Sequence, residues 1–356
     1  MAVSPAKSVT IRMVAERANV STMTVSRVLN NGWVGAETRE RVLSVIAELD
    51  YQPSMTARSL VGDRSFLIGL FIESGVGSYE YDFQAGAVER CRDAGMHLML
   101  ETWSAQDSDL GDKVTKLLRQ LRLEAVILLP PLSDNAVILA RLKEDNVPVV
   151  RISPNDGGFR APVVRMDDYA AARAMTTHLL DYGHRRIGFL RGAPGHRATE
   201  ERYRGFCDVM SERNLPVLPD FVMDANFSFD EGEAAARKML TAENRPTAIF
   251  TSGDDMAVGV FSAALQLGLR LPDELSVTGF DDSPASRRTW PRLTTIRQPV
   301  KAMGWAAADM VIEHSPKRSG WPQSMPERLF EFELVVRNST ARLPCDLIGS
   351  QGSLES

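Results

Sequence analysis

The chain has 356 residues, of which 44% are hydrophobic and 24% charged, a composition typical of a globular protein with two or three compact units. Its 41 Lys and Arg against 46 Asp and Glu give a formal net charge of −5, which excludes a histone-like, polybasic surface. The charge is uneven, because residues 1–62 hold seven basic and five acidic side chains. A head of +2 therefore precedes a body of −7.

The cysteines exclude several classes of protein. Cys91, Cys207 and Cys345 are odd in number and far apart, so neither a disulfide framework nor a Cys-x-x-Cys metal site is expected. The chain has no signal-peptide pattern and no run of about 18 apolar residues, so no membrane association is expected. A reducing cytoplasm fits this composition best.

The first sixty residues predict three helices. Thr10 is a good N-cap for apolar residues that recur at helical spacing over 11–18. A second helix is expected over 21–29 and a third, longer one over 37–49. Two short helices joined by a three-residue turn and supported by a third predict a helix-turn-helix domain over residues 1–52.

The second of these helices leaves a polar face uncovered. Once its apolar side chains face the other helices, Thr22, Met23, Ser26 and Arg27 remain outside. Small polar groups near a helix N-terminus can bind phosphates, and an arginine can reach a guanine edge in the major groove. This face predicts DNA binding, with a three-helix domain that binds protein as the alternative.

A weakly apolar linker over 53–64 leads to a long stretch of alternating strands and helices. This alternation predicts parallel sheets covered by helices, with ligands at the carboxyl ends of the strands. Its length favours two lobes with a cleft between them. The expected strands are 66–72, 97–103, 125–129, 147–152, 186–190, 247–250 and 275–280, and the expected helices include 83–94, 170–180, 201–213, 231–240 and 256–267.

Several motifs closely resemble the lactose/galactose repressor (LacI/GalR) family. In the head, the resemblance rests on Val20-Ser21-Thr22-Met23-Thr24-Val25-Ser26-Arg27-Val28-Leu29-Asn30 and on Thr38-Arg39-Glu40-Arg41-Val42. In the body, it rests on 178–189, 254–259 and 277–282. The resemblance implies an all-α helix-turn-helix head and a two-lobed α/β body of the periplasmic-binding-protein type I, with three crossovers and an effector in the cleft.

The resemblance assigns DNA contacts to the head. It implies that Thr22, Met23 and Arg27 set base preference. Because Met23 cannot form a bidentate hydrogen bond, its selectivity would come from apolar contact, for example with a thymine methyl, and Arg27 would carry the polar readout. The residues that would contact or orient on the DNA backbone are Thr10, Ser21, Thr24, Ser26 and Asn30.

The same resemblance implies that residues 53–64 form a hinge helix on operator DNA. Pro53 can start this helix, Ala57 allows two hinge helices to pair closely, and Leu60 occupies the position of a wedge into the minor groove. The alternative for Leu60 is an ordinary contact with the body. Without DNA, the hinge is expected to be disordered.

The chain departs from the family pattern at three positions. Glu37 stands where a basic or small residue is common. Trp33 stands where a small or polar residue is usual, and we expect it to pack on Val28 or Val34. Gly253 stands where an asparagine often precedes the position of Asp254, so one amide contact with the effector is lost.

The resemblance also implies an effector site. Arg202 and Asp281 would hydrogen-bond the effector, and Phe227 would stack on it. The remaining candidates are the cleft-lining Asp167, Asp254 and Gln298, together with Tyr79 and Tyr81 from a loop over 75–82. Carboxylates and a guanidinium hold vicinal hydroxyls, and an aromatic ring covers the apolar face of a sugar.

Each of the three principal candidates has a structural alternative. Asp281 could cap a turn, Arg202 could form a surface ion pair with Glu200 or Glu201, and Phe227 could belong to the core.

The C-terminal third completes the expected fold. Residues 294–299 and a helix over 300–312 resemble a return crossover to the first lobe, and 331–337 would be the final strand. The body would span 65–344 and be followed by a loose tail over 345–356. Because no leucine heptad follows, a homodimer is favoured over a dimer of dimers.

Together these features predict a homodimeric, cytoplasmic and nucleoid-associated transcriptional regulator, a repressor, which binds a pseudopalindromic operator. Its operator affinity would be controlled by a small effector, a sugar or sugar derivative. The chain shows no catalytic motif, so no enzymatic activity, cofactor or metal is expected. The alternatives are control by a protein co-regulator or a non-sugar metabolite and, more remotely, an enzyme of nucleoside or sugar metabolism.

Overall fold

A computed structural model describes residues 9–29, 32–51, 65–74, 77–155, 158–313 and 325–343. The chain divides into two compact units, Met1–Phe66 and Leu67–Ser356, here termed the head and the body. Three groups of predictions lie outside the described residues: the hinge over 53–64 with Ala57 and Leu60, the contact assigned to Asn30, and the tail over 345–356.

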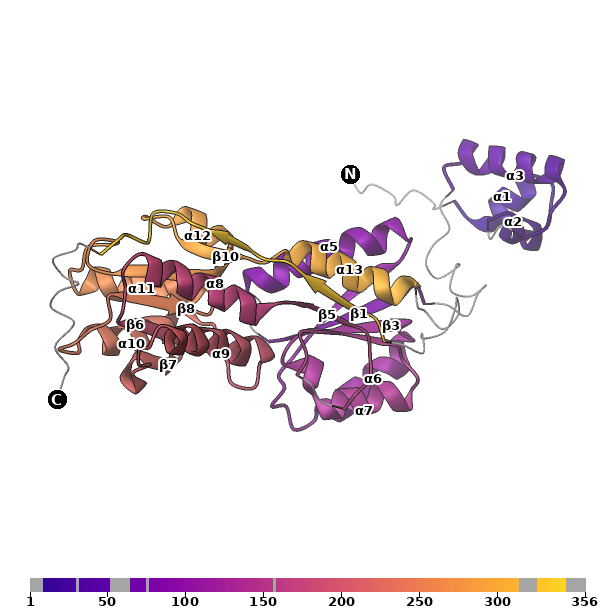
Figure 1. The fold of residues 1–356 in the computed structure, drawn as a ribbon. Coiled ribbons are helices and arrows are strands. Elements are labelled where there is room, and N and C mark those ends of the chain that lie inside the picture. Colours follow the sequence, from indigo (N-terminus) through magenta and orange to yellow (C-terminus); the bar gives the residue numbers. More distant parts are fainter. Residues whose placement is uncertain are drawn as a thin grey trace, which may run out of the picture. The chain divides into compact units, whose positions relative to one another are not determined.

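The head contains the three predicted helices, α1 (Ile11–Arg17), α2 (Thr22–Leu29) and α3 (Ala36–Glu48) (Figure 1). Thr10 caps α1 as expected, because its side chain accepts a hydrogen bond from the backbone N–H of Met13. The helices pack around a small apolar core. Its buried members are Val14, Ala15, Ala18, Val25, Val28, Val42, Val45 and Tyr51.

Two arginines of α3 bind the ends of the other helices. The Arg39 guanidinium donates to the carbonyls of Val28, at 3.4 Å, and Gly32, at 2.6 Å. Arg41 Nε donates to the carbonyl of Ala18 at 3.1 Å. Carbonyls at a helix C-terminus lack partners within the helix, so Arg41 stabilises the end of α1 and Arg39 stabilises the exit from α2.

The prediction that Trp33 packs on Val28 or Val34 is wrong. Its side chain is 91% exposed. Val28 is already buried among the three helices, and Val34 itself packs against this core. The apolar core of the head is therefore already filled, and it leaves no space for the Trp33 indole.

The first lobe of the body is built on a parallel sheet with the strand order β11-β5-β4-β3-β1-β2. One face is covered by α5 (Ser78–Asp93) and α13 (Val300–Glu313), and the other by α6 (Leu110–Leu121) and α7 (Ala136–Glu144) (Figure 1). The strands are β1 (Leu67–Glu73), β2 (His97–Trp103), β3 (Ala125–Leu128), β4 (Val149–Ile152), β5 (Val163–Met166) and β11 (Glu327–Phe330).

The second lobe repeats this architecture with the order β12-β10-β9-β8-β6-β7, in which only β12 is antiparallel to its neighbour. The strands are β6 (Ile187–Arg191), β7 (Val222–Asp224), β8 (Ala248–Thr251), β9 (Ser276–Asp281), β10 (Thr294–Arg297) and β12 (Glu333–Val335). The helices are α8 (Asp168–Asp181), α9 (Arg197–Glu212), α10 (Phe229–Leu240), α11 (Asp254–Gln266) and α12 (Pro284–Arg288).

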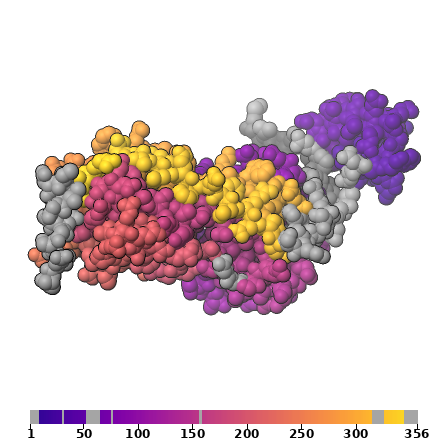
Figure 2. Space-filling model, viewed as in Figure 1, coloured from indigo at the N-terminus to yellow at the C-terminus, as the bar shows by residue number. Residues whose placement is uncertain are grey.

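The chain passes between the lobes three times, after β5, β10 and β11. The final strand predicted over 331–337 is confirmed as β12, which is shorter than expected. The short strand before it, β11, was not predicted. β11 and β12 pair with different sheets, and residues 331–332 pass between them. In Figure 2 the yellow C-terminal residues accordingly run along both lobes of the body.

The loop predicted over 75–82 is wrong, because α5 begins at Ser78. The Glu80 carboxylate accepts a hydrogen bond from the backbone N–H of Gly77 at 2.8 Å and so stabilises the first turn. Further along α5, its backbone closely approaches α13. A Cβ on Gly86 would lie 1.9 Å from the Lys301 carbonyl oxygen, and one on Gly304 would lie 2.0 Å from that of Phe83.

None of the helices in the described part of the chain is both long enough and apolar enough to cross a membrane.

We expect Arg39→Met to destabilise the head without unfolding the body, because two carbonyls lose a charge-assisted donor. Such bonds contribute about 1–3 kcal/mol. Amide hydrogen exchange of the full chain should show faster exchange in α2 and unchanged exchange in the body. Arg12→Met is the control, since Arg12 contacts only Glu16 on an exposed face. Equal protection of α2 in both variants would contradict this role of Arg39.

Candidate functional site

The predicted DNA-reading face of the head lies on α2. Met23 is 65% exposed, and Thr22 and Arg27 are exposed beside it, whereas Ser26 is half-buried. Ser21 caps the helix: its hydroxyl accepts from the Thr24 N–H at 3.1 Å and lies 2.9 Å from the Thr24 hydroxyl. The structure therefore gathers the predicted base-reading side chains on one surface, and their contacts with DNA remain predictions.

The arginines of this head differ in how they are engaged. Within residues 9–29 and 32–51, Arg12 pairs with Glu16 at 3.1 Å and Arg17 with Glu48 at 2.5 Å, while Arg39 and Arg41 bind carbonyls. Arg27 contacts only the sulfur of Met23, at 3.9 Å. Its guanidinium is therefore the one most available to a nucleic acid.

In the body, the buried Arg202 organises the candidate effector site. Its Nε and Nη2 lie 2.8 and 2.7 Å from Oδ1 of Asp168, and Nη1 donates to the Ser252 carbonyl at 2.6 Å. The guanidinium carbon lies 3.5 Å from the ring centroid of Phe280. The alternative of a surface ion pair is therefore wrong. Arg202 is 4% exposed and is bound from three sides.

Its carboxylate partner is a residue that sequence reasoning missed. Asp167 was assigned to the cleft, but its Oδ1 accepts the N–H of Ala170 at 2.9 Å and thereby caps α8. The next residue, Asp168, is 5% exposed and binds Arg202. The sequence shows two adjacent aspartates, and only the start of the helix decides which one turns inward.

Asp281 ends β9 next to this ion pair. Gln298 Nε2 donates to its Oδ1 at 2.5 Å, which brings these two predicted residues together. Burial holds the pKa of Asp281 well above its usual range, although the nearby Arg202 lowers it. The site thus contains a carboxyl group that shifts towards its neutral form.

The backbone that presents Asp281 is strained and held by ion pairs. Asp281 has a φ of +116° and Asp282 a φ of +55°, both in a region that L-residues rarely adopt. The Asp282 carboxylate accepts from Arg297 at 2.7 Å and from Arg337 at 2.5 Å. These two cations anchor the turn so that Asp281 is directed towards Gln298.

Tyr79, on α5 of the first lobe, lies close to the ionisable side chains of Asp168, Asp281 and Arg202. Burial raises the pKa of its hydroxyl well above the usual range, and Asp168 and Asp281 raise it further. Tyr81 follows two positions later on α5 and is 69% exposed. Since two residues span more than half a helical turn, Tyr81 lies on a different face. The structure brings Tyr79, but not Tyr81, to the buried charges.

Phe227 lies beside the same group, and its ring fits there because two neighbouring residues are glycines without a Cβ. A Cβ on Gly192 would lie 2.0 Å from a ring atom of Phe227, and one on Gly253 would lie 3.5 Å from the ring and 3.8 Å from Asp281. The ring centroid of His196 is 5.6 Å from that of Phe227. The departure at Gly253 thus leaves space between the aromatic ring and Asp281. Phe227 also packs on the apolar core of the second lobe, which agrees with the alternative that it is a core residue.

Asp254 is engaged within the second lobe. Its two oxygens accept from the Thr295 hydroxyl and the Ser283 N–H, both at 2.7 Å. The residue is 1% exposed, and burial raises its pKa to about 7. These contacts favour a structural role over the predicted contact with an effector.

A direct hydrogen bond joins the lobes through Asn155. Its amide donates to the carbonyl of Gly195, in the second lobe, at 2.8 Å. The same amide donates to Asp134, in the first lobe, at 3.2 Å. Asp134 is also paired with the buried Arg151. Asn155 therefore forms a hydrogen bond that depends on the relative position of the two lobes.

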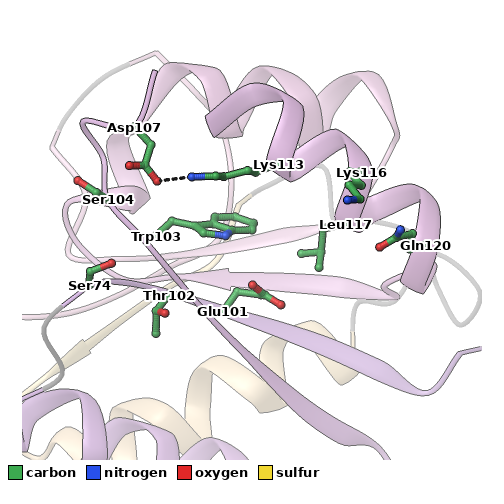
Figure 3. A pocket seen from close by; sticks show the side chains of 10 residues that line it. All are labelled: Ser74, Glu101, Thr102, Trp103, Ser104, Asp107, Lys113, Lys116, Leu117 and Gln120. Carbon is green, nitrogen blue, oxygen red and sulfur yellow. Dashed lines mark hydrogen bonds and ion pairs between the residues drawn. The ribbon is translucent and has the colours of Figure 1, made fainter. Parts of the chain in front are cut away.

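Two pockets lie in the described part of the body, and one of them includes residues of the candidate site. One, of about 490 Å³, contains Asp281 and Gln298 in its wall together with Lys301 and Trp305 of α13. The other, of about 450 Å³, lies between β2 and α6 of the first lobe. Figure 3 shows the indole of Trp103 at its centre, beside the pair of Lys113 and Asp107.

A helix-turn-helix head joined to a two-lobed body with a polar group between its lobes defines a ligand-responsive DNA-binding regulator. The comparisons with known proteins agree. Residues 10–54 match the model of bacterial regulatory proteins of the lacI family, and residues 176–340 match the periplasmic binding protein-like domain.

Full-length relatives extend this match. The ribose operon repressor of Halalkalibacterium halodurans is 33% identical, over 93% of this chain and 97% of that protein. A structure of the lac repressor dimer bound to operator and the anti-inducer ONPF is 28% identical, with a TM-score of 0.80 over 94% of this chain and 100% of that one. A complex of the transcriptional regulator CelR with cellobiose is 26% identical, with a TM-score of 0.72 over 93% and 99%. The chain belongs to the lacI family of bacterial regulatory proteins.

We expect Asp254→Asn to remove part of the pH dependence of stability. A carboxyl with a pKa of about 7 in the folded chain and an ordinary value when unfolded binds its proton more tightly in the folded state. The free energy of unfolding should then fall, by on the order of 2 kcal/mol, as the pH rises from about 4 to about 7.

Denaturant titrations at several pH values measure this slope. The slope should be smaller for Asp254→Asn than for the exposed control Asp220→Asn, and identical slopes would contradict the shifted pKa.

We expect Gly192→Ala to displace the Phe227 ring and so to weaken effector binding by at least about tenfold, with operator binding retained. Calorimetry measures the loss, with whichever mono- or disaccharide or uronate binds the wild-type chain as the ligand. Gly111→Ala in α6 is the control, because its Cβ would meet a single methyl group of Val137 at 3.1 Å. Equal effector affinity in both variants would show that the ring takes no part in binding.

Proposed function

We propose that this chain is a dimeric transcriptional repressor whose operator affinity is controlled by a small polyhydroxylated effector bound between the lobes of its body. The observation that carries the proposal is the group formed by Arg202, Asp168, Asp281 and Tyr79, which combines residues of both lobes. The same chain carries a helix-turn-helix head with an available Arg27.

The chemistry of this group favours a sugar or sugar derivative. A guanidinium and several carboxyl groups can hold vicinal hydroxyls through charge-assisted hydrogen bonds, and the face of Phe227 suits the apolar side of a pyranose or furanose ring. A protonated Asp281 would act as a donor as well as an acceptor, which hydroxyl groups accommodate equally well. The names of relatives point the same way, since one is a ribose operon repressor and another was solved with cellobiose.

Control of DNA binding would arise from lobe closure. An effector that contacts Tyr79 on one side and Arg202 on the other binds the closed arrangement better than the open one, and so shifts the population of closed molecules. The Asn155 bond between Asp134 and Gly195 would form or break with this movement. Coupling between sites in such systems amounts to about 1–3 kcal/mol.

The proposed activity is binding without turnover. The Arg202 guanidinium is already bound by Asp168 and the Ser252 carbonyl, an arrangement that suits binding of a ligand. Operator DNA would be bound in the cytoplasm by the paired heads, with Arg27 directed into the major groove.

Two variants should separate the two halves of this function. Arg27→Ala is expected to lower operator affinity by about 10- to 100-fold while leaving effector affinity unchanged. Arg202→Met, made together with Asp168→Asn so that no buried carboxylate is left unpaired, should abolish the effector response while leaving operator affinity within about twofold. Operator sites would come from selection on random duplexes, effectors from calorimetry with a panel of mono- and disaccharides and uronates, and affinities from fluorescence anisotropy.

The matched control for the head is Arg12→Ala, because Arg12 is also exposed but lies on α1. If Arg27→Ala binds the operator like this control, the recognition role fails. If no sugar in the panel binds, control by a protein co-regulator or another metabolite replaces the sugar.

A further inference from the structure

Trp33 is the most exposed of the large apolar side chains in the described part of the chain, at 91%. It lies only four residues after the last residue of α2, the recognition helix of the proposed function. An indole is among the largest apolar surfaces a side chain can offer, and it also carries one N–H donor. Its free exposure beside a binding helix indicates a partner that covers it.

The backbone next to Trp33 is held in place. The N–H of Gly32 donates to the Arg27 carbonyl at 2.7 Å, and the Gly32 carbonyl accepts from Arg39 at 2.6 Å. Both bonds bind the residue before Trp33 to the head, one of them through Arg27 itself. The indole therefore follows a hydrogen-bonded exit of α2, and the backbone before it is bound to the backbone of Arg27.

The place of Trp33 along the helix points to the sugar-phosphate backbone. In helix-turn-helix proteins the N-terminal residues of the recognition helix contact base edges in the major groove. Thr22, Met23 and Arg27 occupy α2 itself, whereas Trp33 follows its C-terminal end, where the chain leaves the groove. A side chain at this exit meets deoxyribose and phosphate before it meets a base.

We propose that Trp33 is a DNA contact, with its ring packed on a deoxyribose and its indole N–H donating to a phosphate oxygen at the edge of the half-site. This inference rests on the proposed function, because it continues the surface of α2. The contact adds apolar area and one neutral donor to a head whose other described arginines are mostly engaged. It strengthens binding of any duplex and carries little sequence information.

The test measures duplex affinity of the full chain and its Trp33→Ala and Trp33→Phe variants. Trp33→Ala should lose about tenfold for the selected operator and a similar factor for a random duplex of equal length. Trp33→Phe should lose less, because it keeps an aromatic ring, although a smaller one without the N–H donor. Since indole is uncharged, the dependence of log affinity on log salt should keep its slope in both variants.

A second readout follows the indole directly. The difference in emission between the wild-type chain and Trp33→Phe reports Trp33 alone. Acrylamide should quench this difference signal freely in the protein without DNA, and several-fold less in the operator complex. Leu43→Ala is the matched control, because Leu43 is a 48% exposed apolar residue of the same head on α3, and its duplex affinity should equal that of the wild type.

The outcomes distinguish a contact between Trp33 and DNA from its absence. Affinities within twofold of the wild type for both Trp33 variants would overturn the inference, and so would an indole shielded from acrylamide before DNA is added, because another part of the chain or a second copy would then cover it. If Arg27→Ala abolishes operator binding while Trp33→Ala has no effect, the proposed function stands and this inference fails. If neither substitution matters, both fail.

Discussion

The burial of one guanidinium is the constraint on which the body of this protein depends. Arg202 is 4% exposed, and removing an ion from water is expensive unless its donors are satisfied. Asp168, the Ser252 carbonyl and the Phe280 ring supply that compensation from α8, the end of β8 and β9. Because the cation is paired within its own lobe, these side chains are held in place before any ligand arrives.

Burial also shifts the pKa values of the neighbouring carboxyl groups. Asp282 is stabilised as an anion by Arg297 and Arg337, so its pKa is lowered, whereas the buried Asp281 and Asp254 have raised pKa values. These three carboxyl groups thus differ in the direction of their pKa shifts, according to their burial and their partners. A ligand entering here meets a surface that both accepts and donates hydrogen bonds, which suits hydroxyl groups better than a simple ion.

The head could be predicted from sequence almost residue by residue, because apolar residues at helical spacing and a strong N-cap such as Thr10 act locally. The same holds for the strands with long apolar runs. β5, β7, β10 and β11 were not predicted as strands, because each has only three or four residues and includes a charged side chain, whereas the equally short β3 and β8 include none. No local signal at residues 331–332 marks the passage from β11 in one sheet to β12 in the other.

In the candidate site, Arg202 and Gln298 lie close to Asp281, and the family resemblance named all three for the effector site. Their contact with an effector stays a prediction. Sequence reasoning did not find Asp168, because the choice between two adjacent aspartates is made by the first turn of α8. Trp33 was misplaced for a related reason: a general preference of tryptophan for burial says nothing about whether the core has space. Motif residues Arg39 and Arg41 proved to bind helix ends, a role that only the folded head reveals.

The division of the final strands has a consequence for how the chain is made on the ribosome. The first sheet begins at Leu67, yet its edge strand β11 ends at Phe330, and α13, whose backbone approaches α5 through Gly86 and Gly304, ends at Glu313. The head, in contrast, is complete by residue 51. During synthesis the head can therefore fold early, while the first lobe waits, with the inner face of α5 uncovered, until nearly the whole polypeptide has emerged.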